Sequence, residues 1–465
     1  MSTLGDILNT GRYALSVQQL AMQVIGQNTS NVNTDGYTRR RLELTTAPPY
    51  SGLGPWQPGA GVDVESLGRV RDNILDQQFR STSSDVSYWT QKDSVLGQVE
   101  DVFSALGDTS IGTQLQDFWA SWQDLANNPE DMASRTALLV KAQSLTAGVR
   151  RAYSQLSTQC QTVDAQIVQD ANEVNTLTDT IARLNVQIVN SERGGGEASD
   201  LRDERDRNLD RLSQLMDIST QEDGTGALNV YNGGHCLVQT DHSTALTVST
   251  VPSNGGTKSV VQYGGSSDVL SLQSGDIKSL MELRDHDIGT AMSDLNTFAV
   301  ALANRVNEVH RTGYGQNNAT GNDFFADDVT GAANFRVSAD IANDPSLIAS
   351  ASAPDSPGDN TLALQIAGIQ NEKILDNGRS TADEFYQDTV IRVGSQKSYA
   401  SGQLKVEQAA QDNLDTRRQQ VSGVSLDEEM TQLVQVQKAY EAAAKIVTTV
   451  DTMMATILTM GSATG

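Results

Sequence analysis

Residues 425–458, SLDEEMTQLVQVQKAYEAAAKIVTTVDTMMATIL, carry the strongest periodic signal in the sequence. Apolar or aromatic side chains fill every a and d position of four successive heptads. Ser425, followed three residues later by Glu428, is the capping-box pattern that begins a helix. The stretch therefore predicts one long helix with an apolar seam, formed by Leu433, Val436, Tyr440, Ala443, Val447, Val450, Met454 and Ile457.

The other end of the chain carries a second amphipathic helix. Its apolar residues recur at spacings of three and four, and the main ones are Leu4, Ile7, Leu8, Leu15, Met22 and Ile25. The helix should end in residues 28–37, NTSNVNTDGY, because Asn, Asp and Gly adopt turn and left-handed conformations. Apolar stripes of this length do not stay exposed in a soluble monomer. The two ends pair with each other, wait for partners, or do both in turn; the alternative is that each docks on its own domain.

Between these ends the sequence predicts a helical body with a β-rich insertion. Long helical periodicities with few Pro residues alternate with breaks such as residues 194–196, GGG, which predict a helical hairpin. Short runs rich in Val, Leu and Thr between residues 227 and 251 are separated by turn residues, which is typical of β-hairpins.

We therefore expect a mainly α fold with a small β domain, in an elongated multidomain chain whose terminal helices form a coiled coil. The expected domains are a terminal coiled-coil polymerisation domain (1–45 plus 422–465), a helical rod-like domain with loop and strand insertions (46–217 plus 275–421), and a β-rich outer domain (218–274).

Composition excludes several classes of function. The net charge of −25 disfavours nucleic acid and anionic lipid as partners. No stretch approaches the roughly 18 apolar residues of a membrane span, and the N-terminus lacks the features of a cleaved signal peptide. The four His residues are scattered, and Cys160 and Cys236 stand alone, so we expect no metal, no cofactor and no enzyme activity. Pairs of carboxylates leave open a secreted glycan-active enzyme.

Two segments resemble the signatures of a known superfamily. Residues 28–39, NTSNVNTDGYTR, and residues 422–430, SGVSLDEEM, resemble the N- and C-terminal signatures of bacterial flagellar rod, hook and hook-associated axial proteins. Residues 200–206, DLRDERD, together with GNDFF at 321–325 and DPSLIA at 344–349, are similar to one member, the hook-associated protein 1 (FlgK) family. The N-terminal signature places the axial-family motif on Asn28, Asn31, Asn33, Thr34, Gly36 and Tyr37.

This resemblance implies a structural subunit of the junction between flagellar hook and filament, outside the cell. Such a subunit is exported by the flagellar type III system, and its C-terminal helix is held by an export chaperone before assembly. It then forms a ring of identical subunits that contacts the hook protein and a second junction protein. The apolar residues of the two terminal helices would serve polymerisation and chaperone binding. The alternative within the superfamily is a hook subunit or the second junction protein.

Overall fold

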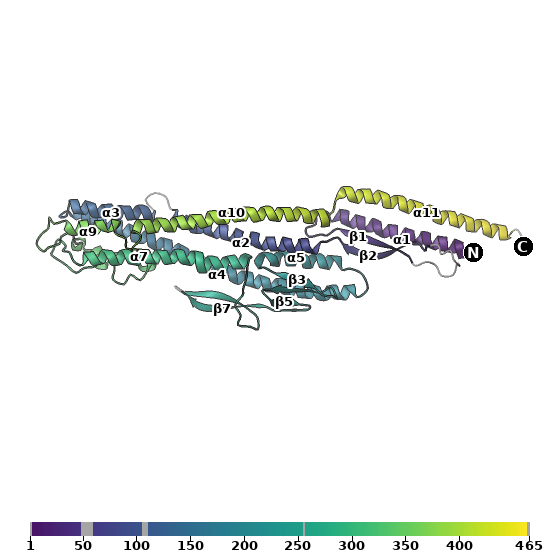
Figure 1. Ribbon diagram of the computed structural model, residues 1–465, viewed down its shortest axis with the longest axis horizontal. Helices are drawn as coiled ribbons and strands as arrows, with labels where there is room; N and C mark the ends of the chain where they lie inside the picture. The colour runs from purple at the N-terminus through teal and green to yellow at the C-terminus, as the bar shows by residue number, and fades with distance from the viewer. Residues whose placement is uncertain (1, 48–58, 105–109, 254–255, 463–465) are drawn as a thin grey trace.

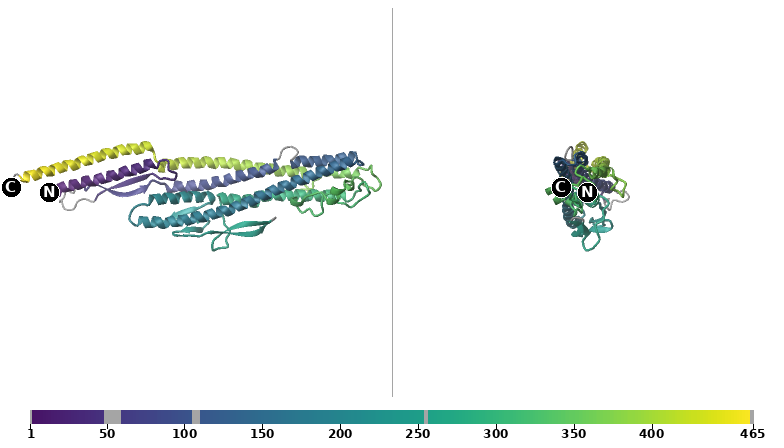
Figure 2. Two further views of the ribbon diagram at one scale, coloured as in Figure 1. Left: turned by 180° about the vertical axis from the view of Figure 1, so that it is seen from behind. Right: turned by 90° about the vertical axis from the view of Figure 1, so that its left-hand side faces the viewer.

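The protein is a long rod with both chain ends at the same tip (Figure 1). The computed structural model describes residues 2–47, 59–104, 110–253 and 256–462. Figure 2 shows the terminal helices projecting past the rest of the rod, which is narrow when viewed end-on. The fold is mainly α-helical with small antiparallel sheets, and the expected fold class is confirmed.

The projecting part consists of the two terminal helices and a two-stranded ribbon. Helix α1 packs against α11 on one side and contacts the ribbon as well. We call these four elements, together with the loop of residues 31–39 between α1 and β1 (the motif loop), the terminal module. The elements are α1 (Ser2–Ser30), β1 (Arg40–Thr46), β2 (Val62–Arg69) and α11 (Leu426–Ser462). The sequence analysis assigned residues 46–69 to the helical domain, whereas β2 packs on α1; the division into domains stays a prediction.

The helical body is built from long helices that run along the rod. Helix α4 alone spans 61 residues, and it begins where the side chain of Asp131 caps its first turn. The α4–α5 hairpin turns at the predicted glycines, and α10 begins at a capping box of Thr381 and Glu384. The body helices are α2 (Asn73–Phe103), α3 (Ile111–Asn127), α4 (Met132–Glu192), α5 (Ser199–Leu215), α6 (Asp276–Glu282), the π-helix η2 (Leu283–Ile288), α7 (Gly289–His310) and α10 (Ala382–Ser422).

The strands of the predicted β region lie against α4. Asn185 and Asn175 of α4 bond to the backbone of Leu228 and Leu246, so helix side chains extend the strand pattern and fix both sheets to the helix. One antiparallel sheet has the order β3-β4-β5-β6, with β3 (Ser219–Glu222), β4 (Leu228–Asn232), β5 (His235–Gln239) and β6 (His242–Ser243). A separate ribbon pairs β7 (Leu246–Ser253) with β8 (Gly256–Tyr263).

Loops and short helices close the end of the rod opposite the chain termini (Figure 1). They connect α7 to α10 and pack around the aromatic residues of α3, including Phe118 and Trp122. The short helices are η3 (Ala332–Asn334), α8 (Ala339–Asn343), η4 (Pro345–Leu347), α9 (Thr361–Gly368) and η5 (Ile369–Asn371).

The main apolar core belongs to the body. Among the described residues it runs from Val95 to Ala400 and contains no residue of the terminal module. The terminal module has its own buried side chains, among them Val24, Ile25 and Val450. The rod therefore contains two separately packed units.

Candidate functional site: the terminal helix pair and its joint

Helices α1 and α11 pair in antiparallel orientation. Gly11 lies beside Val447, and a Cβ at Gly11 would come within 2.7 Å of Val447 Cγ2, so glycine permits close approach of the helices. About two turns further along α1, Gln19 donates to the hydroxyl of Tyr440 at 3.5 Å, and nearly five turns from Gly11, Asn28 donates to Glu429. From one contact to the next, the residue number rises along α1 and falls by a similar amount along α11. These contacts fix the antiparallel register of the two helices.

The structure places the predicted seam residues of α11 toward α1. Ala443 and Val450 are buried, and Leu433, Val436, Tyr440, Val447 and Met454 are half-buried. Ile457, at the end of the seam, is 48% exposed. The predicted seam is thus the paired face, and its burial decreases toward the chain terminus.

On α1 the predicted stripe is only part of the packed surface. Ile25 is buried, Ile7 is 46% exposed, and the remaining predicted residues, Leu4, Leu8, Leu15 and Met22, are half-buried. The sequence analysis missed Val17 and Val24, which are buried. The seven-residue spacing of Val17 and Val24 could have indicated that they share a buried face. The packing of α1 on the β1–β2 ribbon explains why this helix has a second buried face.

Besides the seam residues, α11 carries further large apolar side chains that are largely exposed in the described structure. They lie on more than one side of the helix, and each is about half or more exposed: Met430, Val434, Ile446, Met453 and Leu458. Monomeric proteins rarely display so many apolar side chains along one helix, and such surfaces mark sites of association.

Asn28 connects four parts of the terminal module and is 1% exposed. Its Nδ2 donates to the carbonyl of Arg40 at 3.0 Å and to Glu429 Oε2 at 3.1 Å. Its Oδ1 accepts from the Tyr37 hydroxyl at 2.9 Å and from the Arg40 amide at 3.0 Å. The first Asn of the motif thus ties the end of α1 to the motif loop, to β1 and to α11.

The other motif residues shape the loop between α1 and β1. Asn31 Oδ1 accepts from the Thr34 hydroxyl, and the backbone amide of Thr34 donates to the carbonyl of Asn31. Gly36 has φ +72°, and a Cβ there would meet the side chain of Arg207 at 2.4 Å, so the position requires glycine. Burial raises the pKa of Tyr37. Asn33 is exposed.

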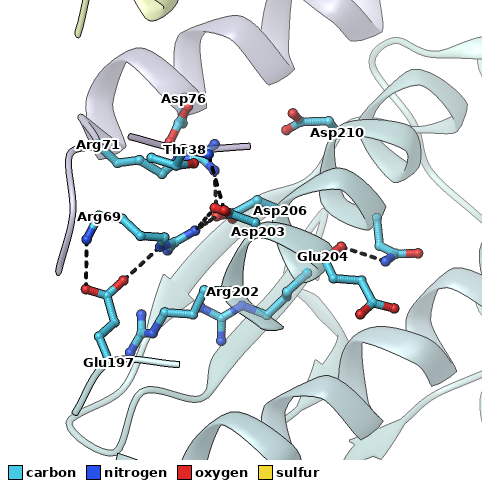
Figure 3. Close-up of polar contacts among 12 residues, drawn as sticks. Thr38, Arg69, Arg71, Asp76, Glu197, Arg202, Asp203, Glu204, Asp206 and Asp210 are labelled. Carbon is cyan, nitrogen blue, oxygen red and sulfur yellow. Dashed lines mark hydrogen bonds and ion pairs between the residues drawn. The ribbon is translucent and has the colours of Figure 1, made fainter. Parts of the chain in front are cut away.

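The terminal module meets the body at a network of charges centred on α5 (Figure 3). Arg69, at the end of β2, pairs with Glu197 at 2.8 Å, Asp203 at 2.9 Å and Asp206 at 2.7 Å. Asp203 also accepts from the backbone amide of Thr38 at 3.2 Å. Each of these contacts joins the terminal module to residues 197–206 of the body.

The same carboxylates bind arginines of the body. Asp206 pairs with Arg71 at 2.8 Å and with Arg80 at 3.1 Å, while Arg418 of α10 bridges Asp76 and Asp210. We call the eight residues the joint cluster: Arg69, Arg71, Arg80, Arg418, Asp76, Asp203, Asp206 and Asp210. Sequence analysis singled out residues 200–206 only as a family motif, although a spacing of three to four from Asp203 to Asp210 signals one helical face.

The joint cluster is buried, and its electrostatics keep it ionised. Side chains of Arg69, Arg71 and Arg80 are 8 to 9% exposed. Burial alone would raise the pKa of Asp206, but the charges of Arg71, Arg80 and Arg69 outweigh this and hold that pKa well below its usual range. A buried carboxylate among three guanidinium groups stays charged at every physiological pH.

A groove of about 1190 Å³ lies beside the cluster. The motif loop and the turn between α10 and α11 form part of its lining, together with α5 residues such as Arg207 and Asp210. Charges of both signs line it, so it does not select a simple anion or cation.

The two other family-like segments meet at the opposite end of the rod. GNDFF (321–325) and DPSLIA (344–349) both contact His310, whose Nδ1 donates to the carbonyl of Asn322 at 2.7 Å and whose Nε2 accepts from the Ala349 amide at 2.9 Å. Arg135 reinforces the second segment by donating to the carbonyl of Ile348 and, at 2.8 Å, to the Ser350 hydroxyl. These segments organise the tip of the body rather than the terminal module.

We expect His310 to make the body less stable in acid. Complete burial lowers the pKa of His310 from 6.5 to about 4, and the hydrogen bond that Nδ1 donates to the carbonyl of Asn322 offsets only part of this effect. Between pH 6.5 and pH 4 the His310 ring is protonated in the unfolded chain and neutral in the folded chain. The free energy of unfolding therefore falls as the pH drops through this range. Linkage gives a loss of about 2 kcal/mol at pH 5 relative to pH 7.

Urea unfolding at pH 7 and pH 5, followed by Trp fluorescence, measures this loss. Trp122 lies 6.4 Å from the His310 ring, centroid to centroid, and reports on the site. His310→Gln keeps a neutral side chain, and its loss between the two pH values should be smaller by about 2 kcal/mol. Equal losses in both proteins would refute the assignment. Comparing the two proteins cancels the pH dependence of stability that comes from other groups. One of these is Asp170, whose pKa is raised to about 7 by burial.

Neither a metal cluster nor a membrane span is found in the part of the chain that the structure describes. Within these residues no three His, Cys, Asp or Glu side chains gather as a metal site. Within the same residues no helix combines the length and hydropathy needed to cross a bilayer.

Comparison with protein families finds matches in both the body and the C-terminal helix. Residues 96–325 match the model described as the flagellar hook-associated protein FlgK helical domain. Residues 417–460 match the C-terminal model of the flagellar basal body rod FlgEFG proteins.

Curated relatives cover between 70% and 96% of the chain. Flagellar hook-associated protein 1 of Bacillus subtilis (strain 168) is 29% identical over 490 aligned residues, which is 96% of this chain and 96% of that protein. Flagellar hook-associated protein 1 of Escherichia coli (strain K12) is 29% identical over 70% of this chain, and that of Salmonella typhimurium is 30% identical over the same share. The match covers 60% of each of these two longer relatives.

A solved structure shares the fold. The flagellar hook junction protein FlgK from Burkholderia pseudomallei superimposes with a TM-score of 0.66 and 16% identity, over 74% of this chain and 100% of that one.

Proposed function

The chain belongs to the FlgK family of flagellar hook-associated proteins, and from that membership we propose that it joins the hook to the filament by polymerising through its terminal helices. Proteins of this family are components of the flagellum and assemble with other axial proteins. The finer proposal is a ring of identical subunits outside the cell, seated on the hook protein and carrying the second junction protein.

The observation that carries this proposal is the set of exposed apolar side chains on α11. The seam that includes Val450 is used within the chain, whereas side chains such as Met453 and Leu458 stay exposed and can make contacts between chains. Burying a fully exposed side chain of this size contributes about 1.5 to 3 kcal/mol before ordering costs are subtracted, and a half-exposed one about half of that. Five such side chains on one helix provide the driving force for assembly.

The same exposed side chains make a chaperone necessary before assembly. A surface of Met, Val, Ile and Leu would aggregate in the cytoplasm, so we propose that the flagellar export chaperone covers the C-terminal helix until the type III system exports the chain. Methionine side chains are flexible and adapt to more than one partner, which suits a helix that binds a chaperone first and sister subunits later.

We propose a binding role rather than catalysis. The relatives are named as hook-associated proteins, not as enzymes. A hook subunit or the second junction protein is the alternative within the superfamily, and the match of residues 96–325 to the FlgK helical domain favours the present proposal over it. The secreted glycan-active enzyme has no specific observation in its favour.

The double variant Met453→Ser, Leu458→Ser tests the proposal. Both side chains are exposed at 52% and 73%, so the purified monomer should keep the thermal unfolding midpoint of the parent. Cells carrying the variant should export the chain into the medium yet make hooks without filaments, visible by electron microscopy.

Val140→Ser is the matched control, because Val140 is an equally exposed apolar residue on α4 of the body. That variant should build normal filaments. Normal filaments in the α11 variant would contradict polymerisation through these side chains, and absence of the variant from the medium would assign them to export instead.

A further inference from the structure

The connection between the terminal module and the body is polar. The apolar core of the described body residues stops short of the terminal module. From the terminal side, Thr38, Arg40 and Arg69 reach residues of α5 and the turn before it through hydrogen bonds and ion pairs. Arg39 adds a backbone bond of 2.8 Å to the carbonyl of Ser422 at the end of α10.

Charge-paired contacts of this kind fix an angle more sharply than apolar packing. Asp206 accepts from arginines on both sides of the joint: Arg69 on β2, and Arg71 and Arg80 on the body side. Hydrogen bonds between guanidinium and carboxylate groups are directional, and a buried charge that loses its partner is strongly destabilised. A tilt of the terminal module that pulled Arg69 away would leave its charge and those of Asp203 and Asp206 poorly compensated.

A groove of about 1190 Å³ runs along the joint. The motif loop, Asp203, Asp206 and Asp210 of α5, and the last turns of α10 form part of its lining. The ion pairs of the joint therefore lie along a groove instead of beneath an apolar interface.

We propose that the carboxylate row of α5, Asp203 and Asp206 with Asp210 behind them, is a clamp that sets the angle between the terminal module and the body. Asp203 and Asp206 hold Arg69 and Thr38 of the terminal module, while Asp206 and Asp210 anchor α5 to Arg80 of α2. The clamp is a positioning device within one chain, and it stands whether or not the terminal helices polymerise.

Distances between spin labels in the full-length monomer test the clamp. One label at Lys438→Cys on α11 and one at Gln408→Cys on α10 span the joint, and both positions are exposed. The two native cysteines, Cys160 and Cys236, are first changed to Ser, and pulsed electron resonance then gives the distance distribution.

Two variants remove the clamp from opposite sides. Asp203→Asn with Asp206→Asn neutralises the carboxylates on α5. Arg69→Gln removes the guanidinium group that the terminal module contributes and leaves every body residue unchanged. Each should shift the main distance and broaden the distribution relative to the parent. Glu204→Gln is the matched control, because Glu204 lies on the same helix with its carboxylate directed away from the cluster (Figure 3), and it should leave the distribution unchanged.

Near-ultraviolet circular dichroism of the buried Trp119 and Trp122 reports whether the body is still folded. If the α5 double variant loses this signal, Arg69→Gln alone decides the question. A parent-like distance distribution in Arg69→Gln would overturn the clamp.

Discussion

Val450→Asp is expected to separate the two terminal helices and to stop filament growth. Val450 is 4% exposed in the seam between α11 and α1, so the substitution places a carboxylate in an apolar, buried position. Loss of the apolar contact and burial of an unpaired charge together cost about 3 to 5 kcal/mol. The body has its own core and should remain folded.

Hydrogen exchange of the purified monomer measures the first effect. In the parent, amides around Ala443 and Val450 should be protected, and in the variant this protection should be lost while that of α4 is kept. In cells, the variant should give hooks without filaments and should release flagellin into the medium. Thr449→Asp puts the same charge on the adjacent, exposed position and should change neither readout. Unchanged protection and normal filaments in Val450→Asp would show that the seam is needed neither for pairing of the terminal helices nor for filament growth.

Asn28→Ala is expected to have the second largest effect. The substitution deletes four hydrogen bonds at once and leaves the carboxylate of Glu429, 1% exposed, without its partner in α1. Unsatisfied buried groups cost about 1 to 3 kcal/mol each, so a total of about 3 kcal/mol or more is expected. The helix pair should fray at its inner end, next to the joint, where the motif loop no longer holds α11.

Exchange rates of amides in residues 22–40 and 426–436 test this effect, together with swimming motility. Asn33→Ala removes an exposed Asn of the same motif and should behave like the parent. Asn28→Asp sharpens the test, because it faces one carboxylate with another, and its defect should lessen in acid as one of the pair takes up a proton. If Asn28→Ala and Asn33→Ala behave alike, Asn28 does not hold the module together.

Local pattern was sufficient for most of the fold. The heptads of α11 required a partner helix, and α1, with its own stripe, is that partner. The Gly-rich turn at 194–196 and the capping-box pattern at Ser425 marked where helices end and begin, because such signals act within a few residues. Val17 and Val24 were missed because their burial also depends on a β-ribbon that contacts α1.

The sequence by itself determined that this chain has two long apolar seams at its ends, a helical middle and a membership in the flagellar axial superfamily, since periodicity and signature residues are read over short distances. Only the tertiary structure decided that the seams face each other in antiparallel register, that further apolar side chains of α11 are exposed in the described structure, and that Asp203 and Asp206 meet Arg69 from more than a hundred residues away. The physical reason is that burial and ion pairing depend on which surfaces the folded chain brings together, and no local pattern specifies the partner of a charge so distant along the chain.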